Sequence, residues 1–144
     1  MLRVVVDTNL FVSALLSPRG APAQILQAWK ERHFVLLCSA GILTEIEATL
    51  TGFVGREPYQ VTNRDVDELL ELLRTEALMT PGNADVSDAT ISDADDLIFL
   101  ACALEGQADA VASGDSDLTA LHSYHDIPIL NARQLIDRLA DETD

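Results

Sequence analysis

The chain has 144 residues, of which 48% are hydrophobic, and this length and composition suit one compact domain with a sizeable core. It carries 24 acidic and 9 basic residues, for a net charge of −15, which argues against sequence-independent binding to nucleic acid through a broad basic face. No apolar run approaches the roughly 18 residues of a membrane span, and no signal-peptide pattern begins the chain. We therefore expect a cytoplasmic protein without a membrane segment.

The first half of the chain alternates apolar strands with helices. In chain order we expect a strand over 2–6, helices over 10–16 and 23–31, a strand over 34–38 and a helix over 40–50. The first run is apolar throughout instead of alternating, as in a parallel strand that is buried on both faces. Pro22 suits the first turn of the second helix, and Ser39 suits the N-cap of the third.

The second half continues this alternation. We expect a loop over 51–61, a helix over 62–74, a short strand over 77–79, a polar connection over 80–91, a helix from 93–96 to about 104, strands over 110–112 and 127–130, a helix over 131–140 and a frayed acidic tail over 141–144. Thr62 and Asp65 have the spacing of a capping box, and Gly106 is placed as a residue just past a helix end. The fold predicted is a three-layer α/β/α sandwich with a mostly parallel sheet of about four or five strands, formed by one domain over 1–144.

Acidic side chains stand where predicted strands end. Asp7 directly follows the first strand, and Asp115 and Asp117 follow the strand over 110–112. Asp93 and Asp96 begin the helix that precedes that strand. If the two strands are parallel, Asp7 and Asp115 leave the same edge of the sheet, where ligands of open α/β sheets bind.

The residue types favour a hard divalent cation. Candidate ligands are Asp7, Glu45, Asp96, Asp115 and Asp117, all of them carboxylates, which favours Mg²⁺ or Mn²⁺ over zinc. Carboxylates crowded at one edge would raise one another's pKa, and a divalent ion would remove that repulsion. Any one of these acids alone would be interpreted as a turn or capping residue. The joint pattern favours a metal site that acts on phosphate esters.

Other phosphate-handling folds are excluded by missing residues. The chain has no glycine-rich loop ending in Lys and Ser or Thr, so it is not a P-loop nucleotidase. A haloacid-dehalogenase phosphatase needs an acid two residues after Asp7, where this chain has Asn9. A response-regulator receiver needs a lysine late in the chain, and the only lysine is Lys30.

Together these motifs resemble the PIN-domain family, which includes the VapC-like toxins of bacterial and archaeal toxin–antitoxin pairs. The resemblance is carried by Val4–Val6 with Asp7-Thr8-Asn9, by an acid near Glu45, by Asp93-x-x-Asp96, and by the segment from Ala108-Asp109 to Asp117-Leu118. It implies that Asp7, Glu45, Asp96 and Asp115 are catalytic and that Asp7, Asp96, Asp115 and Asp117 bind Mg²⁺ or Mn²⁺. Thr8, Asn9, Asp93 and Ser113 would support them. Glu47, two residues after Glu45, stays open as the helix acid.

The resemblance also implies a function: hydrolysis of RNA phosphodiester bonds, as the toxin of a type II toxin–antitoxin system. Arg3, Arg19, Arg32 and Arg56 are candidates for holding phosphates. Expected partners are the RNA substrate, a cognate antitoxin whose basic segment reaches the acidic site, and a second copy of the chain in a homodimer. The alternative is a non-catalytic PIN-like module that binds protein. The acidity itself is open to a further interpretation, adaptation to high salt.

Overall fold

The computed structural model describes residues 1–91 and 93–142, so Thr143 and Asp144 of the expected frayed tail lie outside the described residues. The strands are β1 (Arg3–Val6), β2 (Val35–Ser39), β3 (Leu78–Thr80), β4 (Ala110–Ala112), β5 (Ser123–Tyr124) and β6 (Ile127–Leu130). The helices are α1 (Thr8–Leu16), α2 (Ala21–Lys30), α3 (Ala40–Thr51), α4 (Asn63–Glu76), the 3₁₀ turn η1 (Ala94–Asp96), α5 (Leu97–Glu105), α6 (Ser116–Thr119) and α7 (Ala132–Glu142).

The strands form a six-stranded sheet in the order β3-β2-β1-β4-β6-β5. Every pairing is parallel except that of β5 with β6. A mostly parallel sheet is therefore confirmed, whereas the expected four or five strands are too few. The additional strand is β5, whose two residues are too short to show a strand pattern in the sequence.

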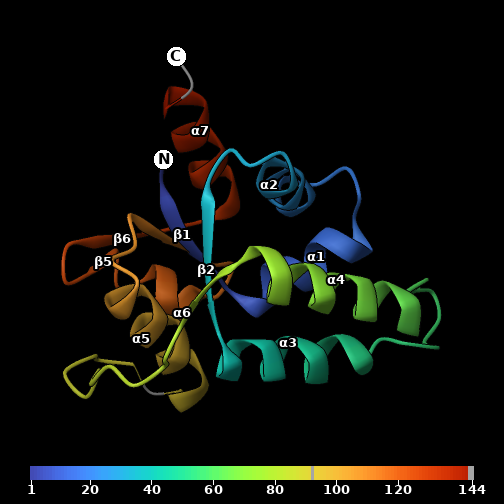
Figure 1. Cartoon of the computed structure of the whole chain (residues 1–144), viewed down its shortest axis with the longest axis horizontal. Coiled ribbons are helices and arrows are strands. Elements are labelled where there is room, and N and C mark those ends of the chain that lie inside the picture. The colour runs from blue at the N-terminus through green and yellow to red at the C-terminus, as the bar shows by residue number, and fades with distance from the viewer. Residues whose placement is uncertain (92, 143–144) are drawn as a thin grey trace.

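Helices cover both faces of this sheet, which confirms the predicted α/β architecture. Helix α5 packs on β1, β2 and β4. In Figure 1 it lies on the opposite side of these central strands from α2. Helix α2 packs against α1 and against α7, and α7 also contacts β4 and β6. Helices α3 and α4 lie side by side at lower right in Figure 1. None of the helices in the described chain is both long and apolar enough to cross a bilayer.

The position of β1 determines where a site can form. Strand β1 pairs with β2 on one side and with β4 on the other, with Val6 opposite Ala112. The chain therefore leaves β1 toward β2 in its first half and returns to the other side of β1 through α5 in its second half. Such a reversal of strand order opens a crevice at the carboxyl ends of the strands. Val4, Val5, Ala110 and Val111 are fully buried, so this edge is held on a rigid support.

Small differences from the expected elements lie at their ends. Helix α1 begins at Thr8 instead of Leu10, and α7 continues through Asp141 and Glu142, which the sequence pattern assigned to a frayed tail. The capping box at the start of α4 is present: the Asp65 amide donates to Thr62 Oγ1 at 3.1 Å, and the Thr62 amide donates to Asp65 Oδ2 at 2.9 Å.

Candidate active site at the carboxyl edge of the sheet

Asp7 is held at the point where β1 ends. Its amide donates to the Ala112 carbonyl at 2.9 Å, which continues the pairing of β1 with β4 by one residue. Its carboxylate is buried, makes no cap hydrogen bond to α1, and accepts a hydrogen bond from Ser113 Oγ at 2.6 Å. Asp7 occupies the N-cap position of α1, and the first backbone amides of that helix, those of Thr8 and Asn9, lower the pKa of its carboxylate.

Ser113 joins the two strand ends. Its side chain is completely buried, and its hydroxyl oxygen also accepts a hydrogen bond from the Asp115 amide at 2.9 Å. The Ser113 amide donates to the Leu130 carbonyl of β6 at 2.9 Å. One small hydroxyl residue thus fixes the Asp7 carboxylate relative to the backbone that carries Asp115.

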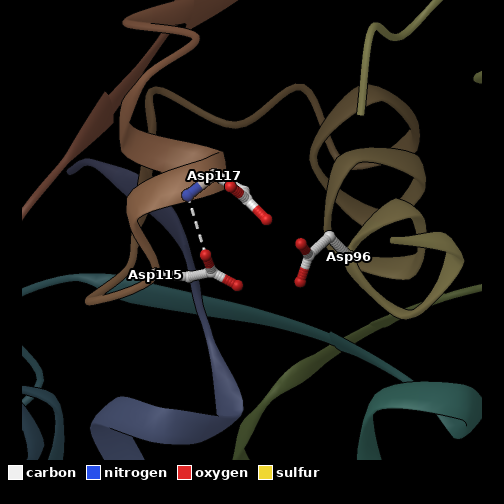
Figure 2. A group of neighbouring side chains, drawn as sticks. All are labelled: Asp96, Asp115 and Asp117. Atoms are coloured by element: carbon white, nitrogen blue, oxygen red, sulfur yellow. Dashed lines mark hydrogen bonds between the residues drawn. The ribbon is translucent and has the colours of Figure 1, made fainter. Parts of the chain in front are cut away.

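Three carboxylates converge across the gap between α5 and α6. One oxygen from each of Asp96, Asp115 and Asp117 lies within 4.8 Å of the other two. Figure 2 shows Asp96 reaching from the start of α5 toward Asp115 and Asp117. The Asp117 amide donates to Asp115 Oδ1 at 2.8 Å, so Asp115 also caps its short helix while its other oxygen faces the gap.

The structure places Glu45 and Glu47 on different sides of α3. Glu45 is half-buried, and the charge of Asp7 acts on it directly. Glu47 is exposed and lies 3.8 Å from an Arg74 guanidinium nitrogen on α4. Of the two candidates from the sequence, Glu45 is therefore the acid that lies beside the site.

The electrostatics of the site favour neutral carboxyl groups or a bound cation. The pKa of Asp96 is raised to about 7, first by its removal from water and next by the charge of Asp115. Burial is also the largest cause of the raised pKa of Asp7, and the charge of Asp115 adds to it, while the hydrogen bond from Ser113 acts in the opposite direction. Burial and the charge of Asp7 likewise raise the pKa of Glu45.

Three buried polar atoms of this region have no hydrogen-bond partner within the described chain: Thr8 Oγ1, Glu45 Oε2 and Asp96 Oδ2. Buried oxygen atoms normally have partners, because an unpaired one costs about 1–3 kcal/mol. Unpaired carboxylate oxygens that face further carboxylates fit a hard divalent cation in both charge and ligand type. The acids at this edge are therefore chemically suited to hold such an ion.

The expected supporting residues differ in what they contact. Ser113 Oγ donates to Asp7 Oδ2 at 2.6 Å, and the Thr8 side chain acts on Glu45 and lowers the pKa of that carboxyl. Asn9 is exposed. Asp93 is exposed and accepts a hydrogen bond from the Asp95 amide at 2.9 Å, as a capping residue does, and its charge contributes to the raised pKa of Asp96.

Two of the arginines considered for phosphate binding lie away from this edge. Arg3 begins β1, and its guanidinium donates to the Gly106 carbonyl at 2.8 Å, at the amino ends of the strands. Arg32 lies in the turn before β2, at the same end. Neither can reach a phosphate at the carboxyl edge, because the length of the strands separates the two ends.

One polar contact of the site region was not foreseen from the sequence. Asp88, in the connection after β3, accepts hydrogen bonds from the Tyr124 hydroxyl and, at 2.7 Å, from the ring Nε2 of His125 when that nitrogen is protonated. The contact joins the segment that leads to Asp93 and Asp96 to the β5–β6 hairpin. No local sequence pattern signals this contact, because Tyr124 and His125 follow Asp88 by 36 and 37 residues in the chain.

Comparison with known proteins gives a consistent result. A family model described as the PIN domain matches residues 3–117. An uncharacterized protein of Methanocaldococcus jannaschii, MJ1680, is 32% identical over 125 residues, covering 83% of this chain and 75% of that protein.

Two solved structures share the fold. VapBC2 from Rickettsia felis, bound to a DNA fragment from its promoter, aligns with a TM-score of 0.60 and 12% identity, over 90% of this chain and 98% of the matched chain. FitAcB from Neisseria gonorrhoeae aligns with a TM-score of 0.54 and 17% identity, again over 90% of this chain and 98% of the other. At such low identity these similarities concern the fold alone.

Proposed function

The chain belongs to the PIN-domain family, and from that premise we propose that it is a metal-dependent endoribonuclease that hydrolyses RNA phosphodiester bonds. The observation that supports this most directly is the convergence of Asp96, Asp115 and Asp117, with ligand oxygens within 4.8 Å of one another. Asp7 is not in that group of three, but its charge acts on Asp96 and the charge of Asp115 acts on it. Residues 1–144 would act as one catalytic domain.

In this proposal Asp7, Asp96, Asp115 and Asp117 hold Mg²⁺ or Mn²⁺, and Glu45 completes the catalytic set beside Asp7. A divalent ion lowers the pKa of a coordinated water and shields the charge of a phosphate. Ser113 keeps the Asp7 carboxylate oriented through its 2.6 Å hydrogen bond. The raised pKa of Asp96 means that protons compete with a cation for this carboxylate near neutral pH.

The test combines cleavage with melting. We expect Mg²⁺ or Mn²⁺ to support cleavage of RNA and to raise the melting temperature, and EDTA to abolish both effects. Asp7→Asn should remove activity at little cost in stability, because it relieves repulsion between buried carboxylates. Asp7→Asn and Asp96→Asn should also erase the stabilisation by metal, since each removes a ligand.

Asp67→Asn is the matched control, because Asp67 is exposed on α4, outside the site. It should cleave RNA and respond to metal as the unmodified chain does. If metal leaves the melting temperature of all four proteins unchanged and no RNA is cleaved, the alternative of a non-catalytic protein-binding module replaces this proposal.

We further propose that the chain is the cytoplasmic toxin of a toxin–antitoxin pair and that it forms homodimers. Two of the structures of similar fold are VapBC2 and FitAcB, the first of which is described with promoter DNA. A surface with net charge −15 attracts basic peptides, so an antitoxin segment with an arginine or lysine could pair with Asp96 and Asp115 and exclude the metal.

The partner proposal has its own test. The reading frame beside this one should encode a small protein with such a basic segment, and co-expression should yield a complex without nuclease activity. Sedimentation should show pairs of this chain when it is expressed alone. The absence of such a frame, together with harmless expression of the chain, would argue against the toxin role and leave the nuclease proposal intact.

A further inference from the structure

A hollow of about 480 Å³ opens at the same carboxyl edge of the sheet, between α6 and the start of α7. Six polar side chains contribute to its lining: Ser113, Ser116, Thr119, His122, Asn131 and Gln134. Strand β6, whose carboxyl end leads into it, is the direct neighbour of β4, whose end carries the acids. The hollow therefore lies one strand away from the candidate metal ligands, about 5 Å along the sheet.

The lining of the hollow is polar and holds few ionisable groups. Although the chain has 24 acidic and 9 basic residues, none of the described residues that line the hollow is Asp, Glu, Lys or Arg, and His122 is the only ionisable group among those described. A cation would find no carboxylate there, and a phosphate would find no ammonium or guanidinium. The chemistry of the hollow fits an uncharged ligand that forms hydrogen bonds, and its volume is in the range of small-ligand sites.

Asn131 and Gln134 leave hydrogen-bond donors available to such a ligand. Gln134 N donates to Asn131 Oδ1, and Asn131 N donates to Gln134 Oε1, both at 2.8 Å. These two bonds use the amide oxygens of both side chains and fix their orientation. The two NH₂ groups make no hydrogen bond within the described chain, and each can donate to a carbonyl or ring nitrogen.

The hollow and the acid cluster are both built on Ser113 and helix α6. Ser113, whose hydroxyl binds Asp7, also contributes to the lining. Helix α6 places Ser116 and Thr119, three residues apart, toward the hollow, while Asp115 and Asp117 on either side of Ser116 join the acid cluster. A ligand in the hollow would therefore lie at a fixed position relative to a phosphate held at the acids.

We propose that this hollow binds the nucleoside, base and ribose together, that adjoins the scissile phosphate of a single-stranded RNA. The inference rests on the proposed nuclease function and adds to it the part of the protein that selects the cleavage site. Unpaired bases can turn out of the strand and be read by hydrogen bonds to their edges, whereas paired bases cannot enter. The side-chain amides suit the acceptor atoms of such an edge.

The first test uses uncharged nucleosides and the metal-free protein, so it does not depend on catalysis. Adenosine, guanosine, cytidine and uridine are titrated separately while backbone amide resonances are recorded. We expect at least one of them to shift the resonances of Ser116, Thr119 and His122, and inorganic phosphate to leave them in place. Absence of nucleoside binding, or binding of phosphate in the hollow, would overturn the proposal.

Asn131→Asp is the informative variant, because it keeps the oxygen that caps α7 and removes the NH₂ donors. We expect it to weaken nucleoside binding about tenfold, in line with the energy of one good contact to a base edge. The melting temperature should not fall, since Asp is as good an N-cap as Asn. Gln27→Glu, at an exposed position of α2, adds the same charge far from the hollow and should bind as the unmodified chain does.

The second test uses the metal-loaded enzyme and a single-stranded oligoribonucleotide. Ala120→Trp fills the hollow from an exposed lining position, and Ala48→Trp places the same side chain at an exposed position of α3. We expect a rise in KM of about tenfold for the first variant and none for the second. Unchanged cleavage by Ala120→Trp would overturn the proposal that the hollow binds a nucleoside and would leave the proposed nuclease function intact. Nucleoside binding without any cleavage of RNA would overturn the nuclease function and leave the nucleoside site intact.

Discussion

At the scale of single residues, Asp96 is the acid whose surroundings oppose ionisation most clearly. Its pKa is raised to about 7, whereas an unfolded chain would have a value near 3.9. Between these values the folded protein holds a proton that the unfolded chain has already lost. The free energy of unfolding must therefore fall as the pH rises through this range.

This sign gives a prediction for the protein in EDTA. Its stability should be greater near pH 4.5 than near pH 7.5, with Asp96 contributing up to about 1.4 kcal/mol per pH unit between the two pKa values. Chemical denaturation at a series of pH values measures the slope. Asp96→Asn should flatten it, and Asp67→Asn should not. A slope that is the same in all three proteins would show that Asp96 does not titrate in this range.

Ser113 shows how one hydroxyl can organise two strand ends. We expect Ser113→Ala to lower the free energy of unfolding by about 1–3 kcal/mol, because the buried Asp7 carboxylate loses a hydrogen bond that nothing replaces. Urea denaturation measures the loss. Ser116→Ala, at an exposed serine three residues later, is the control and should change stability by a few tenths of a kcal/mol at most.

At the scale of elements, the capping box of α4 stabilises the start of that helix and does not involve the site. Thr62→Ala should lower stability by about 1 kcal/mol, because the Asp65 amide loses its acceptor. RNA cleavage should be unaffected, since α4 carries none of the acids of the site. Thr75→Ala, near the other end of α4, removes a hydroxyl that only bonds back to Glu71 and Leu72, and it should be neutral or slightly stabilising. Equal losses for both variants would contradict the capping account.

The end of α5 was predicted correctly from Gly106, but the structure gives a different physical reason for the glycine. Gly106 was expected past the helix end, and α5 does end at Glu105. The left-handed residue there is Gln107, with φ of 52°, whereas Gly106 has φ of −85°. A Cβ on Gly106 would lie 2.6 Å from Leu37 Cδ1 of β2, so the close approach of the sheet explains the glycine.

At the scale of the whole molecule, the net charge of −15 makes stability dependent on salt. We expect the melting temperature to rise as KCl increases to about 1 M, because the Debye length falls from roughly 10 Å at 0.1 M to 3 Å. Scanning calorimetry across a KCl series measures this. A further rise above about 1 M would indicate adaptation to high salt, and a plateau would mean that the acidity serves solubility alone.

Much of this architecture follows from local features of the sequence. Unbroken apolar runs such as Val4–Val6 predicted buried parallel strands, and the acids that end them predicted which edge would carry a site. The spacing of Thr62 and Asp65 predicted a helix start that the structure contains. The predictions of the strands and of the helix start succeed because strand burial, capping and the alternation of β and α depend on residues close together in the chain. The site at this edge stays a prediction.

Other features depend on the packing of segments that lie far apart. Whether Glu45 or Glu47 faces the site depends on the rotation of α3 against its neighbours, and the periodicity of that helix is compatible with both. The contacts of Asp88 with the β5–β6 hairpin and the polar hollow beside α6 join residues from separate segments. The sequence by itself determined the strands other than β5, the caps and the candidate acids, because short-range physics governs them. Only the tertiary structure decided which of the side chains meet, because that depends on the order of the strands on either side of β1 and on the packing of the helices against them.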